Sequence, residues 1–558
     1  MAFFQNPPEP QDAYLEGKAL RLEVRRRLPP ALLTIVEPRF TTLGKATREE
    51  LPRLAEAAEA HPPVHVPYGP FGLRVDEVRT HPAWDQLKAF AAKHGLVSTG
   101  YDESLGVHRR VVQAALLHLF AGSSATYSCP LAMTDAAARV LLENGPPELR
   151  DRLVPRLLAT DPQYFITSGQ WMTERAGGSD VGGTETIARA VEDDPGGRQF
   201  QLYGTKWFTS AVTSEMALTL ARTNDSEGNL VAGSSGLTLF CVEVKPRPIG
   251  GYEGIVVLRL KDKLGTRALP TAELSLEGLA AVQVGERGKG VKTISSMLNL
   301  TRWHNAIASA SGMARATALA KDYAQRRRAF GQPLYDHPLH RHTLMDMEAE
   351  TAAATALCFE VASLLGLEEQ GMLDEAGRQR LRGLIPITKL TCARQAVALA
   401  SEALEAFGGA GYIEDTGLPR LLRDAQVLSI WEGTTNVLSL DVLRAEERGG
   451  SVSALLADLL ARAEALPATV ADSARDVVVT TVQRAQRRLH LDGGPDGRGR
   501  REANARRLAM TIGFTTEALL LAEASTCDNA DDDAGARFTR FVAHRLQSPF
   551  AECATSMP

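Results

Sequence analysis

A glutamate between an aromatic residue and a glycine is the strongest candidate for acid–base chemistry in this chain. Glu432 lies between Trp431 and Gly433, within the run IWEGTTN at residues 430–436. Apolar shielding on one side of a carboxylate and open backbone on the other suit a general base. The same pattern also fits a surface glutamate at the start of a helix, so this motif leaves both interpretations open.

Two further stretches combine hydroxyl side chains with exposed backbone amides. Residues 172–181 read MTERAGGSDV, and residues 204–210 read GTKWFTS. Glycine-containing loops of this kind can bind a phosphate or the polar edge of a flat heterocycle through their backbone N–H groups. Taken separately, the first stretch also fits an ordinary turn, and the second fits a hairpin with a packed aromatic residue.

Two short runs with aromatic residues and glycine lie within helical sequence, and the first also contains arginines. Residues 327–331 read RRAFG, and residues 407–412 read FGGAGY. The first also fits the charged last turn of a helix that Gly331 ends. The second lacks the preceding strand that a dinucleotide fingerprint requires. Neither run indicates a ligand by itself.

The segment 484–507 contains eight arginines against three acidic residues. Arginines placed like this, among them Arg498, Arg500 and Arg501, can neutralise the phosphates of nucleic acid. The segment also fits a solvated helix face, because the acidic residues at 528–533 offset much of its charge. The histidines at 337, 340 and 342 have no accompanying cysteine or carboxylate motif, and we expect no metal site.

The elements that must position these residues change character twice along the chain. Helical periodicity extends from about residue 15 to 158 and returns near 291, and the stretch between them resembles a small antiparallel barrel or sandwich. The expected strands are 200–203, 216–221, 237–244, 254–260, 271–276 and 281–284. The expected later helices are 295–325, 339–366, 376–407 and 420–444, followed by further helical sequence at 446–558.

Composition narrows the class of protein. The 558 residues suffice for three or four domains, and 44% hydrophobic with 23% charged residues is typical of soluble globular proteins. Aromatic residues make up only 6%, which favours a mostly helical chain over a β sandwich or propeller. The net charge of −5 argues against general coating by nucleic acid and leaves a local basic patch open.

Other features bear on the compartment of the protein. The six cysteines include no CxxC pair, which predicts neither a disulfide framework nor a cysteine-rich zinc site. The first residues resemble neither a secretory signal nor a mitochondrial presequence, and no apolar run of about 18 residues occurs. We therefore expect a cytoplasmic protein without a membrane span.

The five motifs together, in this order and spacing, resemble the acyl-CoA dehydrogenase family. In that family the loop reads T-E-x-x-x-G-S-D, the strand carries W-x-T, and R-x-x-F-G, G-G-x-G and Y-E-G-T follow. The resemblance covers roughly residues 68–444 and implies a mostly α fold with a central β domain. The implied domains are an N-terminal arm and helical domain at 1–164, a β-barrel at 165–286, a four-helix-type domain at 287–445 and an extra helical domain at 446–558.

A narrower resemblance is to the adaptive-response (AidB) branch of that family. It rests on residues 74–78, 81–84 and 128–134, on the loop and strand motifs, and on the extra C-terminal helical domain. Members of this branch are linked to DNA binding and alkylation stress, or to the binding of long acyl chains.

The resemblance also implies roles for single residues. Glu432 matches the catalytic base, and Phe208 and Ser210 take the places of the family's Trp and Thr beside the flavin. Arg327 and Phe330 would reach the FAD of a neighbouring subunit, with the arginine on the pyrophosphate. The implied substrate-binding residues are Ser179, Glu432 and Gly433. The implied FAD-binding residues are Met172, Thr173, Gly178, Ser179, Phe208, Thr209, Ser210, Arg327, Phe330, Gly409, Trp431, Gly433, Thr434 and Asn436.

The implied function is that of an FAD-dependent oxidoreductase, which removes an α-proton and a β-hydride from an acyl-CoA thioester. Electrons would pass to an electron-transferring flavoprotein, and the assembly would be a homotetramer. The alternative is an AidB-like flavoprotein that mainly binds double-stranded DNA in alkylation stress, through Arg498, Arg500 and Arg501, or sequesters an acyl chain, with weak dehydrogenase activity. Glu432 is present in either case and does not decide between them.

Overall fold

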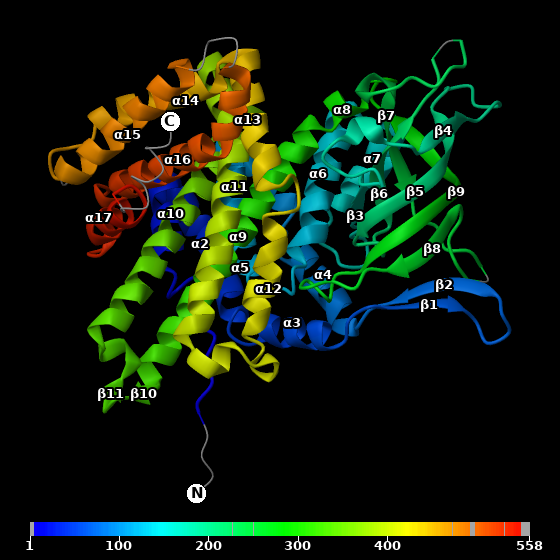
Figure 1. The fold of residues 1–558 in the computed structure, drawn as a ribbon. Helices are drawn as coiled ribbons and strands as arrows, with labels where there is room; N and C mark the ends of the chain where they lie inside the picture. The colour runs from blue at the N-terminus through cyan, green and yellow to red at the C-terminus, as the bar shows by residue number, and fades with distance from the viewer. Residues whose placement is uncertain are drawn as a thin grey trace, which may run out of the picture. The chain divides into compact units, whose positions relative to one another are not determined.

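The chain forms two compact units, each assembled from separate stretches of sequence. Figure 1 shows the computed structural model, which describes residues 5–225, 227–248, 250–470, 472–491, 497–528 and 530–547. We call residues 53–101 and 124–301 the β unit, and residues 1–52, 102–123 and 302–558 the helical unit.

The β unit contains a small barrel. Strands β6, β7, β9, β5 and β4 pair in a ring, which closes where Ile187 of β4 meets Arg222 of β6. Strand β3 joins β6 and strand β8 joins β9. The strand bounds are β3 Ser168–Trp171, β4 Ile187–Ala190, β5 Gln199–Ser210, β6 Met216–Arg222, β7 Leu237–Glu243, β8 Ile255–Leu260 and β9 Thr271–Val284.

The expected barrel is confirmed, with three corrections. Strands β3 and β4 were not expected from the sequence. The β3–β6 and β4–β6 pairings are parallel, so the sheet is mixed and not wholly antiparallel. The two strands expected at 271–276 and 281–284 are the single strand β9, because Gly278 takes a φ of +78° and lets the strand bend without ending. Large apolar side chains, including Trp171, Phe200 and Phe240, fill the barrel interior.

In sequence, the helices of the β unit come before and after the barrel strands. One segment that was expected to be helical is instead a hairpin. Strands β1 Val64–Tyr68 and β2 Arg74–Arg79 pair antiparallel. Buried Asp76 ties the hairpin to β8, because its carboxylate accepts hydrogen bonds from Arg74 Nε (2.8 Å) and the Val257 amide (3.3 Å). The Val257 contact joins residues that are far apart in the sequence, so the local sequence pattern does not reveal it. The helices are α4 Pro82–Lys93, α6 Ser128–Asn144, α7 Pro147–Leu157 and α8 Gly290–Thr293.

The helical unit is built on long antiparallel helices (Figure 1). The helix expected at 420–444 is wrong as one element: α12 and α13 are separate, and the loop between them carries Glu432. The bounds are α1 Lys18–Arg27, α2 Pro30–Ala46, α5 Arg109–Ala121, α10 Pro338–Glu369, α11 Glu375–Ala406, α12 Pro419–Leu428 and α13 Thr435–Gly449. Helices α3 Glu50–Ala60 and α9 Ser295–Arg326 cross the unit boundaries, and β10 Arg328–Ala329 pairs with β11 Gln332–Pro333.

The C-terminal extension packs against α10, α11 and α13. It comprises α14 Ser451–Glu464, α15 Asp472–Leu491, α16 Gly497–Ser525 and α17 Ala534–Arg545. Gln395 of α11 donates hydrogen bonds to Glu350 of α10 and to Glu517 of α16, both at 2.9 Å. Gly513 of α16 lies so close to Thr391 that an added Cβ would be 2.1 Å from the threonine Oγ1. The extension is therefore part of the helical core.

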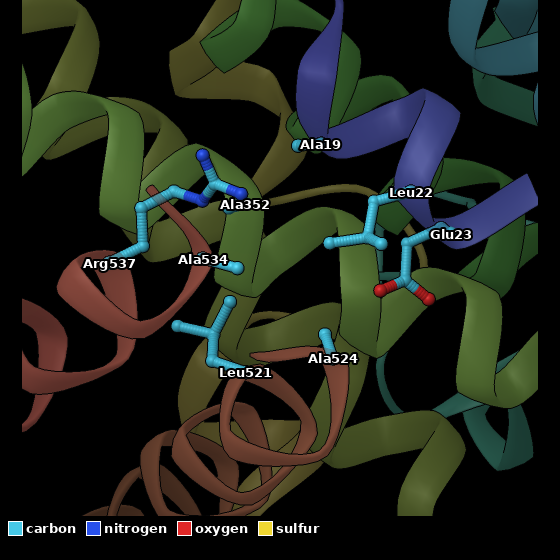
Figure 2. A pocket seen from close by; sticks show the side chains of 8 residues that line it. All are labelled: Ala19, Leu22, Glu23, Ala352, Leu521, Ala524, Ala534 and Arg537. Atoms are coloured by element: carbon cyan, nitrogen blue, oxygen red, sulfur yellow. The ribbon is translucent and has the colours of Figure 1, made fainter. Parts of the chain in front are cut away.

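A small pocket lies where the extension meets α1 and α10. Figure 2 shows Glu23 at one side of it and Arg537 at the other, with apolar side chains between them. Glu23 is already paired with Arg26 and Arg27. The pocket contains none of the residues that the sequence predicts for the site. Its lining residues are Ala19, Leu22, Glu23, Ala352, Leu521, Ala524, Ala534 and Arg537.

Two sequence expectations can be compared with the part of the chain that the structure describes. The five described cysteines are free thiols, as expected, and Cys553 lies outside the described residues. One described helix, α10, is long and apolar enough to cross a membrane, whereas no such segment was expected from the sequence. Of its most apolar 18-residue window, 83% is buried, and core helices meet the same criteria of length and composition.

Candidate functional site

The loop between α12 and α13 holds Glu432 in an unusual backbone conformation. The φ of Glu432 is +56° and that of Gly433 is +104°. A non-glycine residue with positive φ is strained, and such strain persists only where the surrounding structure holds it. The Thr434 hydroxyl caps α13 and the Trp431 amide donates to Val427 O at 3.0 Å. The loop is thus fixed at both ends.

Two cations of the helical unit hold the carbonyl groups of this loop. Arg302 Nε of α9 donates to Glu432 O at 3.3 Å, and Lys389 Nζ of α11 donates to Gly433 O at 2.7 Å. Arg302 is itself fixed by Asp441 Oδ2 at 2.8 Å, and Arg382 donates to the other oxygen of Asp441 at 2.8 Å. The peptide planes on either side of Gly433 are therefore set by side chains from other helices.

The Lys389 ammonium lies in an apolar environment. Its side chain is buried, and burial lowers the pKa of Lys389 to about 7, an effect that Glu432 opposes and Arg302 reinforces. Neither Lys389 nor Arg302 was among the residues predicted from the sequence. The available signal was a lone lysine in the apolar run LIPITKLTCA at 384–393, a pattern that indicates a buried cation.

In the β unit, a buried ion pair anchors the loop that begins at Met172. Glu174 accepts hydrogen bonds from Lys206 Nζ (2.7 Å), the Glu185 amide (2.6 Å) and the Thr186 hydroxyl (2.5 Å). Burial disfavours the charge on Glu174, but Lys206 and the other donors outweigh it and lower the pKa of Glu174. The Trp207 amide donates to Thr173 O at 2.9 Å. The loop and β5 thus form one rigid piece.

Beyond this anchor the loop is open. Residues 175–180 are exposed, including Gly178 and Ser179, whereas Met172 is buried. Gly177 takes a φ of +118°, and an added Cβ there would meet nothing within 4 Å. This stretch presents backbone amides and a hydroxyl to its surroundings.

At the end of β5, the three predicted cofactor residues Phe208, Thr209 and Ser210 do not all lie on the same face of the strand. Phe208 is half exposed, and the Lys261 ammonium lies 4.5 Å from the centre of its ring. Ser210 is partly buried, 3.3 Å from the Thr271 hydroxyl. Thr209 is buried and its hydroxyl donates to Ala272 O at 2.6 Å, so its side chain serves the sheet in this structure.

The remaining predicted residues lie in the helical unit. Arg327 follows the last turn of α9, and the tight turn between β10 and β11 exposes 94% of Phe330. Gly409 lies in an exposed 3₁₀ turn, Gly408–Gly411, with open space around it. Asn436 accepts a hydrogen bond at 3.3 Å from Arg506 of α16, so the extension reaches the Glu432 loop.

The arginine-rich segment is exposed in part. Arg484 and Arg487 of α15 and Arg498 and Arg500 of α16 are exposed, whereas Arg501 is partly buried. Arg498 is paired with Glu502 at 3.0 Å. Of the acidic residues that were expected to offset this segment, Asp531 is paired with Arg537 and Asp533 with Lys18, whereas Asp492 and Asp496 lie outside the described residues.

The three histidines form no metal site in the described part of the chain, where no group of metal-ligating residues occurs. His337 faces Gln332 and the Ala329 carbonyl, and His342 faces Asp346 and Arg540. These local partners account for two of the three rings.

Three family models match successive parts of the chain. The N-terminal domain of the adaptive response protein AidB matches residues 5–164, the acyl-CoA dehydrogenase middle domain 169–279 and the acyl-CoA dehydrogenase C-terminal domain 288–446. The chain belongs to the acyl-CoA dehydrogenase family. Within that family, its N-terminal domain places it in the AidB branch.

Individual relatives agree with this assignment. Acyl-CoA dehydrogenase family member 11 of Caenorhabditis elegans is 42% identical over 94% of this chain and 86% of its own. The putative acyl-CoA dehydrogenase AidB of Escherichia coli is 35% identical over 75% of this chain and 74% of its own. The crystal structure of C. elegans ACDH-11 with C11-CoA has a TM-score of 0.92 at 38% identity, covering 100% of this chain and 96% of that one.

The family is FAD-dependent, and the β-unit residues fit such a group. The open loop at 175–180 offers backbone amides to polar edges of a cofactor, and half-exposed Phe208 offers a ring for stacking. A Bacillus anthracis acyl-CoA dehydrogenase, solved with FAD, shares the fold at a TM-score of 0.69 and 18% identity, covering 95% of this chain and 90% of that one.

Proposed function

We propose that the protein is an FAD-dependent acyl-CoA dehydrogenase, which removes an α-proton and a β-hydride from an acyl-CoA thioester. The observation that carries this proposal is the strained Glu432 loop, whose two carbonyls are held by Arg302 and Lys389. The C. elegans relative in complex with C11-CoA supports a fatty acyl-CoA as the substrate.

In this mechanism Glu432 takes the α-proton. The α-proton of a thioester is weakly acidic, so negative charge that develops on the carbonyl oxygen must be stabilised by a nearby donor. A backbone N–H beside Glu432 supplies that donor, and the anchored carbonyls keep it in place. The left-handed backbone conformation of Glu432 thus orients both the carboxylate base and the neighbouring N–H donor.

FAD supplies the acceptor for the β-hydride when it is bound. In the β unit, Met172, Thr173, Gly178, Ser179, Phe208 and Ser210 would hold the flavin, while Thr209 supports the strand from within the sheet. In the helical unit, the family resemblance assigns Trp431, Gly433, Thr434 and Asn436 to FAD binding. An electron-transferring flavoprotein would accept the electrons.

The test is anaerobic reduction of the flavin by a panel of acyl-CoAs of increasing chain length. Loss of the visible flavin band at a rate that depends on chain length supports a dehydrogenase. A flavin that no member of the panel reduces, although the CoA esters bind, contradicts it and favours sequestration.

Arg327→Ala is expected to lose FAD and to weaken the assembly together. We propose that the chain is a homotetramer in which Arg327 and Phe330, with Gly409, bind the FAD of a neighbouring subunit. A charge-assisted hydrogen bond between arginine and the pyrophosphate would stabilise both FAD binding and the contact between subunits. Light scattering and flavin absorbance measure the two effects, and Arg378→Ala, an exposed arginine of α11, is the control. A fully flavinated monomer of the wild-type protein contradicts the proposal.

A second candidate function is binding of double-stranded DNA. The exposed arginines of α15 and α16 favour it, and so does the likeness to AidB. Two of the acidic residues near the C-terminus are already paired and repel a duplex less than their charges suggest. In this role the protein would be held on DNA, and its dehydrogenase activity would be weak.

Neutralising Arg498, Arg500 and Arg501 together is expected to reduce the salt dependence of DNA retention. Each phosphate contact releases about 0.9 counterions, so the slope of log K against log salt falls by up to about three units. Flavin reduction should stay unchanged. The control neutralises Arg378, Arg444 and Arg448, three exposed arginines elsewhere in the helical unit. Equal retention of both triple variants and the wild type assigns the extension a structural role.

A further inference from the structure

Lys389 is a buried cation that the proposed mechanism has not used beyond its hydrogen bond. It lies in the middle of α11, where Ile387, Leu390 and Ala393 around it are also buried. Its ammonium donates to Gly433 O at 2.7 Å, one residue beyond the proposed base. Burial of a charge is costly unless the charge serves a partner, so a lysine here needs an explanation.

The charged groups that face Lys389 are few. Glu432 from the loop acts on it with the opposite charge, and Arg302 from α9 acts with the same charge. Several acidic groups on the other elements packed against α11 have partners of their own. These are Asp441 of α13 with Arg302 and Arg382, Glu350 of α10 with Arg545, Asp424 of α12 with Arg420, Asp458 of α14 with Arg380, and Glu517 of α16 with Gln395.

We propose that Lys389 is a positioning residue for Glu432, whose ammonium fixes the Gly433 peptide and whose protonation state sets the field at the carboxylate. This inference rests on the proposed role of Glu432 as the base. Glu432 and a protonated Lys389 carry opposite charges, so proton transfer from the substrate to Glu432 is less favoured beside the cation than beside the neutral amine.

The protonation change occurs at physiological pH. Because the pKa of Lys389 is about 7 in the folded protein, its charge is lost there, while an unfolded lysine keeps its proton to near pH 10.5. Between these limits the unfolded state binds more protons, so the folding equilibrium constant rises with pH, by up to about tenfold per pH unit.

The first test compares unfolding of the wild type and Lys389→Gln, each with its cofactor bound, between pH 6 and 9. Glutamine keeps an N–H donor for Gly433 O but carries no charge. We expect the wild type to gain stability relative to the variant above pH 7 and not below it. Lys45→Gln, at an exposed lysine of α2, should follow the wild type. Parallel pH dependence of the wild type and Lys389→Gln overturns the proposal.

The second test is the rate of flavin reduction by a fixed acyl-CoA over the same pH range. The wild-type rate should rise about three- to tenfold through pH 7, as the cation beside the base is lost. Lys389→Gln should lack this step, and Lys389→Met, which also lacks the donor, should be slower at every pH while retaining FAD. A step of unchanged size in Lys389→Gln overturns the assignment.

The two proposals fail in different ways. If Glu432→Gln reduces flavin at the wild-type rate, the role of Glu432 as the base fails, whatever Lys389 does. If Glu432→Gln is inactive but Lys389→Gln keeps the wild-type pH profile, only the role of Lys389 fails.

Discussion

Glu432→Gln is expected to slow flavin reduction by acyl-CoA by about 10²–10⁴-fold while the protein keeps its fold and yellow colour. The change keeps the shape of the side chain and removes the proton acceptor, and general-base catalysis is typically worth about this factor. The strained backbone and the contacts of Arg302 and Lys389 involve main-chain atoms, so they remain. Stopped-flow absorbance under anaerobic conditions measures the rate.

Glu447→Gln is the matched control for this experiment. Glu447 is an exposed glutamate of α13 in the same unit, and its amide variant should reduce flavin at the wild-type rate. A Glu432→Gln protein as fast as this control means that another group takes the proton.

Lys206→Met should destabilise the β unit by about 3–5 kcal/mol, because it leaves Glu174 as an uncompensated buried charge. Lys206 is fully buried and Glu174 has 3% exposure, so water cannot replace the lost ammonium. Glu174 also holds residues 185 and 186, so the loop at 173–186 should loosen and the protein should lose FAD. Chemical denaturation and flavin content measure the two effects.

Two comparisons sharpen that experiment. The double variant Glu174→Gln with Lys206→Met should recover part of the lost stability, since it removes both charges. Arg259→Met removes a 63% exposed cation from Glu273 in the same unit and should cost less than about 1 kcal/mol. If the single and double variants are equally unstable, the ion pair is not the cause.

The sequence predicted the helices and strands whose residue pattern is set by neighbouring residues in the chain. Strands β5 to β9 and the long helices α9, α10 and α11 follow from runs of apolar residues with period 2 or about 3.6, whereas the short strands β3 and β4 were not predicted. Glu432 was predicted because Trp431, Gly433 and Thr434 are its neighbours in sequence. The break between α12 and α13 follows from two consecutive residues with positive φ, a backbone feature that a helical apolar period does not show.

Other features depend on contacts between distant segments. The hairpin β1–β2 is stabilised at Asp76 by β8, about 180 residues away in sequence, so its own residues look like part of a helical region. Lys389 meets Gly433 across 44 positions, and Arg302 meets Glu432 across 130. Only the folded chain brings these cations to the loop. The division of β5 into an exposed Phe208 and an inward Thr209 depends on a register shift between Lys206 and Thr209.

The Gly513 contact and the Gln395 bridge make the last hundred residues difficult to remove. Cutting the chain after Gly450 would uncover the α11 surface at Thr391 and leave Gln395 without the Glu517 partner that burial holds at a raised pKa. A truncated protein should therefore be insoluble unless that surface is redesigned. Helix α11 and the extension should therefore unfold as one cooperative unit, because loss of α14–α17 exposes Thr391 and Gln395, which are 0% and 2% exposed in the full chain.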